Sequence, residues 1–187
     1  MNKERVLVIG AHCDDESFGC LGTLLEHKKA GDKIEFLSFT SARNTLNGFI
    51  RCAQYFDSHY AILNYKDQEY DSYPIKKFIL DVECWVNTFK PTIVYFPFIA
   101  DLNRDHRIIS EASMVALRPY KFKNAPLCLM YETPGSTELG LRPFVPDHIE
   151  QIDQKKKKAL LSKWYPGEMI NGRSVIMSDE RFERWPR

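Results

Sequence analysis

The chain has 187 residues, 44% of them hydrophobic and 27% charged, which suits one globular domain spanning residues 1–187. A net charge of +1 lacks the strong basic excess of nucleic-acid-binding proteins, so we expect no nucleic acid partner. Five scattered cysteines without a CxxC pair indicate neither a disulfide framework nor a cysteine zinc site. Without a long apolar run or a signal peptide, we expect a cytoplasmic protein with no integral membrane segment.

An almost continuous apolar run rich in branched residues predicts a buried strand at 5–11, and further strands are predicted at 33–39, 92–96 and 127–131, with a short one at 60–63. Apolar residues spaced three and four apart predict helices at 17–30, 46–57, 73–90, 108–117 and 149–164. Four lysines, Lys155–Lys158, are interpreted as a solvated face of the last helix. The last twenty or so residues are polar and carry no clear pattern.

Strands that alternate with helices predict an α/β fold. Right-handed crossovers make this a single-domain, Rossmann-like, doubly wound and mainly parallel sheet with helices on both faces. In such a sheet, ligands bind beyond the carboxyl ends of the strands, where the strand order reverses. The loops after the first and fourth strands are therefore the places to look for a functional site.

The loop after the first strand holds His12, Asp14 and Asp15. Carboxylates packed this closely disfavour each other's ionisation unless a cation compensates them. Imidazole and carboxylate are ordinary zinc ligands, and one turn at a helix start can aim His12 and Asp15 at a single point. Asp14 then points elsewhere and is free to accept a proton from an attacking water.

The loop after the fourth strand ends in Asp105 and His106, and His106 could supply a third ligand. Three protein ligands with an open position are typical of catalytic zinc. Asp105 could orient a ring nitrogen of a ligating histidine. Taken singly, acidic residues at a helix start are usually caps and a loop histidine is usually a surface residue. Their joint occurrence in these two loops favours a metal site.

The segment AHCDDE at 11–16 resembles the AHPDDE motif of the PIG-L/LmbE-like N-acetylglucosaminyl deacetylases. DLNRDH at 101–106 resembles the second metal motif of that family, and the whole stretch 90–119 looks like the family's fourth strand, metal loop and following helix. The segment 19–40 is similar to its first helix and second strand. The resemblance extends over residues 4–165 and rests on two specific motifs.

The resemblance implies a Rossmann-like fold and Zn²⁺ bound by His12, Asp15 and His106. It implies that Asp14 is the general base and that Asp105 tunes the neighbouring histidine chemistry. The implied substrate is a small-molecule amino sugar conjugate of the N-acetylglucosamine type, from which acetate is released. Members of this family often assemble, so a homo-oligomer is also expected.

Two departures from the family pattern concern the metal loops. Cys13 replaces the usual proline, which should loosen the first loop without removing a ligand. Asn103 stands where many members have a histidine. An amide can still donate a hydrogen bond to an oxyanion, but it cannot donate a proton. The acid role would then fall to protonated Asp14 or to another group.

Substrate recognition is expected in the loops that follow the strands. The segment 41–51 fits the family poorly and leaves two arginines open as sugar or phosphate contacts. For Arg118, capping of helix carbonyls is an equal alternative. The candidates for substrate binding are Arg43, Arg51, Asp71, Arg118 and Glu132.

Three other functions can be weighed against a deacetylase. A nucleotide-binding domain is disfavoured, because Gly10, Gly19 and Gly22 do not form G-x-G-x-x-G. A metal-dependent hydrolase of another amide or of a phosphate ester remains open, although phosphoesterases generally use two metals and more ligands. A non-catalytic sugar-binding relative is also open, but it would not need Asp14.

Overall fold

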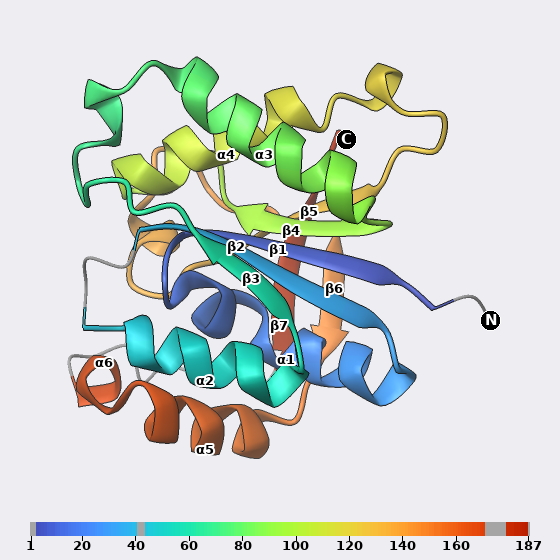
Figure 1. Cartoon of the computed structure of the whole chain (residues 1–187). Helices are drawn as coiled ribbons and strands as arrows, with labels where there is room; N and C mark the ends of the chain where they lie inside the picture. The colour runs from blue at the N-terminus through green and yellow to red at the C-terminus, as the bar shows by residue number, and fades with distance from the viewer. Residues whose placement is uncertain (1–2, 41–43, 171–178, 187) are drawn as a thin grey trace.

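The structure is a computed structural model that describes residues 3–40, 44–170 and 179–186. Seven strands form one sheet in the order β3-β2-β1-β4-β5-β7-β6 (Figure 1). The strands are β1 (Arg5–His12), β2 (Lys33–Thr40), β3 (His59–Ile62), β4 (Ile93–Pro97), β5 (Leu127–Tyr131), β6 (His148–Gln151) and β7 (Asp179–Trp185). The first five in chain order pair in parallel.

Helices cover both faces of the sheet, α3 and α4 on one side and α1, α2 and α5 on the other (Figure 1). The helices are α1 (Asp15–Ala30), α2 (Leu46–Phe56), α3 (Ile75–Phe89), α4 (Arg104–Ala116), α5 (Gln154–Trp164) and α6 (Pro166–Ile170), with short 3₁₀ turns η1 (Tyr70–Ser72), η2 (Pro119–Lys121) and η3 (Thr137–Leu139). The predicted fold class is confirmed. Among the described residues, no helix is long and apolar enough to cross a bilayer.

β1 shows why its sequence is apolar without interruption. Val6 and Val8 pack into the core beneath α1 and α2, whereas Leu7 and Ile9 pack into the core beneath α3 and α4. All four side chains are fully buried. A central parallel strand buries both faces, so it needs apolar residues at every position rather than at alternate ones.

Two antiparallel strands at the end of the sheet were not predicted. The helix expected at 149–164 is wrong at its start, because His148–Gln151 forms β6 and α5 begins only at Gln154. β7 pairs antiparallel with both β5 and β6. Its sequence DERFERW gives no apolar alternation, since its buried Glu180 and Glu183 are balanced by ion pairs with distant residues.

The first helix is interrupted at Cys20, and a buried ion pair forms hydrogen bonds with the backbone groups that the interruption leaves unpaired. Cys20 has non-helical angles of φ −141° and ψ 15°. In a regular helix, the Gly22 N–H would donate to the Phe18 carbonyl. Here it donates to Glu180 Oε1 at 2.8 Å, while Lys157 Nζ donates to the Phe18 carbonyl at 2.8 Å and lies 2.5 Å from Glu180 Oε1.

The interpretation of Lys155–Lys158 as a solvated face is therefore wrong for Lys157, which is only 5% exposed. Replacing Lys157 with Met should destabilise the fold by about 3–5 kcal/mol, because it leaves a buried carboxylate without its cation. The urea midpoint of unfolding measures this loss. The matched change Lys158→Met, at an exposed neighbour, should stay within about 0.5 kcal/mol of the wild type. Equal midpoints for the two variants would contradict the assigned role.

The strand order reverses between β1 and β4. From this pair the chain proceeds outward to β2 and β3 on one side and to β5 on the other. The segments that leave the carboxyl ends of β1 and β4 therefore diverge and leave a crevice between them. The two motif loops, 12–16 and 100–106, lie at this point.

Candidate metal centre

Three buried side chains converge at the carboxyl ends of β1 and β4. His12 Nδ1 lies 3.2 Å from His106 Nε2 and 3.5 Å from Asp15 Oδ2. His106 Nε2 lies 3.3 Å from Asp15 Oδ1. His12 ends β1, Asp15 opens α1 and His106 lies in the first turn of α4. Residues 94 positions apart are thus brought together at the crevice of the sheet.

The spacing of these atoms suits a zinc ion. Zinc binds imidazole nitrogen and carboxylate oxygen at about 2.0–2.1 Å in a tetrahedron, whose edges are then about 3.3–3.4 Å long. The three distances between His12, Asp15 and His106 lie close to that edge length. Asp15 Oδ1 is also buried, and His106 Nε2 at 3.3 Å is the polar atom given beside it among the described residues. Since a buried carboxylate between two imidazoles is a donor set that zinc accepts, these residues fit a cation.

A second ring of polar groups holds His106 in place. Asp101 Oδ1 lies 3.2 Å from His106 Nδ1, the ring nitrogen that faces away from the cluster. Asp101 Oδ2 in turn accepts hydrogen bonds from Thr137 Oγ1 at 2.5 Å and Ser136 Oγ at 3.0 Å. A carboxylate on the outer nitrogen of a ligating histidine is a recurrent arrangement in zinc sites.

Sequence reasoning did not single out Asp101. The signal available was an acidic residue in the same loop as a ligand histidine, since such histidines need an acceptor for their second ring nitrogen. Thr137 and Ser136 could not have been found in this way, because they come from η3 and the residue before it, far along the chain.

His12 is held from the opposite side by two carboxylates. Its Nε2 lies 3.3 Å from Asp105 Oδ2 and 3.1 Å from Asp67 Oδ1. Asp105 Oδ2 also accepts a hydrogen bond from the Gln68 N–H at 2.8 Å. Asp105 was expected to act on a histidine, and the ring that it contacts is that of His12. Asp67 was missed, because only the fold brings the segment after β3 to this crevice.

The carboxylates around the His12 and His106 rings favour the protonated, positively charged form of both. Burial disfavours a protonated ring, but Asp15 and the hydrogen bonds with Asp105 and Asp67 outweigh it and raise the pKa of His12 to about 11. Burial is likewise outweighed at His106, where Asp15 and Asp101 raise the pKa to about 9. Despite complete burial, the two rings hold the pKa of Asp15 well below its usual range. The same carboxylates would favour a divalent cation among them.

Comparison with known proteins agrees with these motifs. The sequence model of the PIG-L family, described as GlcNAc-PI de-N-acetylase, matches residues 7–117, which is more than half of the chain. The uncharacterized deacetylase YaiS of Escherichia coli (strain K12) is 30% identical over 176 residues, covering 87% of this chain and 91% of that protein. The chain belongs to the PIG-L family.

Solved structures share the fold at lower identity. The N,N'-diacetylchitobiose deacetylase from Pyrococcus horikoshii has a TM-score of 0.71 at 17% identity, over 99% of this chain and 85% of that one. GalB, the 4-carboxy-2-hydroxymuconate hydratase from Pseudomonas putida KT2440, has a TM-score of 0.72 at 17% identity, over 97% and 96% of the two chains. Because a deacetylase and a hydratase share this PIG-L-like architecture, the fold alone does not determine the reaction.

Asp14 lies in the chain between His12 and Asp15, two of the three candidate metal ligands. It is the N-cap of α1, and its carbonyl accepts hydrogen bonds from the N–H groups of Ser17 and Phe18 at 3.0 Å each. Its side chain is fully buried. The position suits a proton acceptor beside the metal cluster, and that role stays a prediction.

Asn103 is the N-cap of α4. Its Oδ1 accepts a hydrogen bond from the Asp105 N–H at 2.9 Å, which is the usual work of an asparagine at a helix start. The carbonyl oxygen is thereby committed to the backbone, and the NH₂ group remains as the donor side of the amide. That the Asn103 NH₂ group donates a hydrogen bond to an oxyanion stays a prediction.

Glu16 is the last residue of the first PIG-L motif, and its hydrogen bonds go to residues outside the candidate ligand set. Its Oε1 accepts hydrogen bonds from Ser17 Oγ at 2.8 Å and Tyr165 Oη at 3.0 Å. Burial raises its pKa to about 8. The side chain therefore ties the start of α1 to the segment between α5 and α6.

The arginines predicted to bind substrate do not join the cluster. Arg43 lies outside the described residues. The exposed Arg51 donates to the Lys163 carbonyl at 3.3 Å, so it caps the end of α5. Arg118 follows α4, whose 13 residues are about 20 Å long, and this helix leads away from the metal loops. Its guanidinium lies over the Tyr120 ring, 5.2 Å from the centroid.

The two acidic candidates lie at the same edge of the sheet as the metal cluster. Asp71, in η1, pairs with Arg104 at 2.8 Å beside the first turn of α4. Glu132 follows β5 and binds Arg181 through two hydrogen bonds of 2.7 and 2.8 Å. Arg181 belongs to the unpredicted strand β7, so the sequence analysis could not have found this pair.

Replacing Asp101 with Asn should weaken zinc binding by about 10–100-fold, the effect typical of losing a carboxylate behind a ligand histidine. Competition with a chromogenic zinc chelator measures the change. As a control, Asp57→Asn alters an exposed residue at the end of α2 and should leave the zinc affinity as it is. Equal zinc affinities for the two variants would contradict a supporting role for Asp101.

Proposed function

We propose that this PIG-L family protein is a zinc-dependent hydrolase that removes the acetyl group from an N-acetylglucosamine-type conjugate and releases acetate. The observation that carries this proposal is the spacing of the donor atoms of His12, Asp15 and His106, close to the edges of a zinc tetrahedron. Family membership and the name of the YaiS relative support a deacetylase.

The reaction adds water across an amide. The water oxygen bonds to the acetyl carbon, the C–N bond breaks, and the amine leaves with a proton that began on the water. When bound, zinc supplies Lewis-acid polarisation of the carbonyl and a lowered pKa for the attacking water. The proton still needs a carrier, and we assign that role to Asp14, a buried carboxylate next to the candidate ligand Asp15 in the chain.

In this mechanism, Asp14 accepts the proton of the attacking water at a carboxylate oxygen and later delivers it to the leaving amine. The NH₂ group of Asn103 donates a hydrogen bond to the oxyanion that forms on the former carbonyl oxygen. Asp101 and Asp105 touch no substrate. They act through the histidine rings that they contact, and hold these rings in the tautomer and orientation that ligation requires.

Acetate release from a panel of acetylated amino sugars tests the proposal. The zinc-loaded protein should release acetate from at least one N-acetylglucosamine conjugate, and chelation should stop the release until zinc is restored. The panel should also include a simple phosphate ester and an amide without a sugar. Turnover of only those compounds would replace the deacetylase with one of the alternative hydrolases. Tight zinc binding without turnover of any compound would favour a non-catalytic sugar-binding relative.

A further inference from the structure

The strand β1 keeps a partner strand on one side only as it approaches the metal centre. On the β2 side, the pairing continues to His12, which lies opposite Thr40. On the β4 side, the pairing ends at Val8, which lies opposite Tyr95. The last four residues of β1, among them a candidate metal ligand, therefore border the crevice without support from β4.

The carbonyl groups of Ile9 and Ala11 point toward this open side. The Arg5 carbonyl accepts from the N–H of Thr92, the residue before β4, and strand residues two apart direct their carbonyls to the same side. If the pairing of β1 with β4 continued in register, the Ile9 carbonyl would face the nitrogen of Pro97, which carries no hydrogen. The end of β1 therefore needs hydrogen-bond donors from elsewhere in the chain.

Two tyrosine hydroxyls donate to these carbonyls. Tyr131 Oη, at the end of β5, donates to the Ile9 carbonyl at 2.8 Å, and Tyr70 Oη, in η1, donates to the Ala11 carbonyl at 2.7 Å. Both side chains are fully buried. Tyr131 packs into the core beneath α1 and α2, whereas Tyr70 packs into the core beneath α3 and α4. The end of β1 is thus held from both faces of the sheet.

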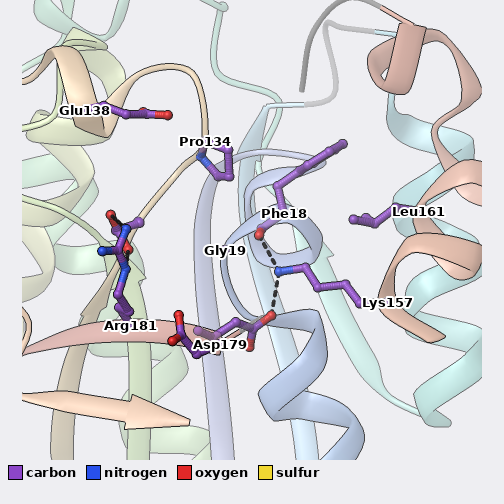
Figure 2. Close-up of a pocket in the computed structure, with 10 residues that line it drawn as sticks. Phe18, Gly19, Pro134, Glu138, Lys157, Leu161, Asp179 and Arg181 are labelled. Carbon is purple, nitrogen blue, oxygen red and sulfur yellow. Dashed lines mark hydrogen bonds and ion pairs between the residues drawn. The ribbon is translucent and has the colours of Figure 1, made fainter. Parts of the chain in front are cut away.

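Tyr131 reaches β1 by passing close to α1. Gly19 lies in the first segment of α1 next to Phe18, whose carbonyl is joined to Lys157 by a dashed line in Figure 2. A Cβ at Gly19 would collide with the Tyr131 ring. The glycine therefore leaves the space that the ring needs to bring its hydroxyl to the Ile9 carbonyl.

Tyr70 contacts the peptide group that carries His12. Its hydroxyl bonds the carbonyl of the Ala11–His12 peptide, and the N–H of the same peptide donates to Asp15 Oδ2 at 2.9 Å. The Tyr70 ring also stacks on the His12 ring, with the centroids 6.4 Å apart and an angle of 30° between the planes. One side chain thus contacts the backbone and the ring of one candidate ligand, and the peptide that it fixes also bonds a second.

We propose that Tyr70 and Tyr131 are positioning residues of the metal centre, which hold the carboxyl end of β1 where the sheet opens and so keep His12 and Asp15 at the spacing that zinc requires. This role rests on the zinc binding of the proposed function, and not on the identity of the acylated substrate. Tyr70 should have the larger effect, because the carbonyl that it bonds belongs to the residue next to His12.

Zinc affinity, from competition with a chromogenic chelator, and the visible spectrum of the cobalt-loaded protein test this role. Tyr70→Phe should weaken zinc binding about tenfold, the lower end of the loss that follows removal of an outer partner of a ligand. It should also shift the cobalt absorption bands, which depend on the geometry of the ligands. Tyr131→Phe should change both quantities in the same direction by a smaller factor.

Tyr95→Phe is the matched control. It removes the hydroxyl of another buried tyrosine, whose Oη lies 3.0 Å from His27 Nε2 in the last turn of α1. Losing a buried hydrogen bond should lower the urea midpoint of unfolding in all three variants. Only the two variants at the end of β1 should also change the zinc affinity and the cobalt spectrum.

The outcomes separate this role from the proposed function. If the wild type binds zinc and Tyr70→Phe changes zinc affinity and cobalt spectrum no more than Tyr95→Phe does, the positioning role is overturned and the proposed function stands. If Tyr70→Phe weakens zinc binding and the wild type releases no acetate from any acetylated amino sugar, the proposed function is overturned and the positioning role stands. A wild-type protein that binds no zinc would overturn both.

Discussion

Replacing Asp14 with Asn should lower the kcat of acetate release by about 10²–10⁴-fold and leave zinc bound, because a general base of this kind contributes that much. Asn has nearly the same shape but cannot accept a proton. The three candidate ligand side chains belong to other residues, so the metal content should not change. Single-turnover rates and the zinc content per chain, measured on the same preparation, give the two values needed.

The two halves of this prediction fail in different ways. A variant that keeps its zinc and most of its rate would remove Asp14 from the proton-transfer step. A variant that loses its zinc would mean that Asp14 belongs to the ligand set, and the role of base would then need another buried carboxylate.

Replacing His106 with Ala should abolish acetate release. It should also weaken zinc binding by more than a change at a residue that only contacts a ligand histidine, for which a loss of about 10–100-fold is expected. The change removes one of three donors and leaves Asp15 with one imidazole instead of two. Zinc affinity from chelator competition and activity at saturating zinc should fall together. His59→Ala, which removes the exposed side chain at the start of β3, is the matched histidine control and should change neither quantity.

Activity in His106→Ala with wild-type zinc affinity would contradict the ligand assignment. Partial recovery of activity at high zinc concentration would support it, since a weakened site can still be filled by mass action. Loss of activity with unchanged zinc affinity would instead make His106 a residue that acts on the substrate.

The interruption of α1 and its ion pair affect how the results for the Asp14 and His106 variants are interpreted. α1 begins with the candidate ligand Asp15, and its first segment ends at Cys20, where Lys157 and Glu180 bond the two backbone groups that a regular helix would pair. A variant in the metal loop that also shifts the unfolding midpoint would have disturbed this junction. The urea midpoint should therefore be measured for each variant beside its zinc affinity.

The sequence alone determined the parallel core of the fold and the three side chains of the candidate metal cluster. Central parallel strands are mostly apolar along their length, so β1, β4 and β5 could be recognised without knowledge of their neighbours. His12, Asp15 and His106 could be recognised because two short motifs lie at the carboxyl ends of strands, where the topology brings loops together.

Tertiary structure alone decided which partners balance the buried charges. Asp67 and Thr137 reach the cluster from segments that carry no motif, and their contacts depend on how η1 and η3 pack. The buried carboxylates of β7 are balanced by Lys157 and Arg142, and hydrophobic patterning cannot predict such pairs. The local sequence pattern indicates which residues are buried. The free-energy cost of a buried charge depends instead on its partner, and that partner can lie anywhere in the chain.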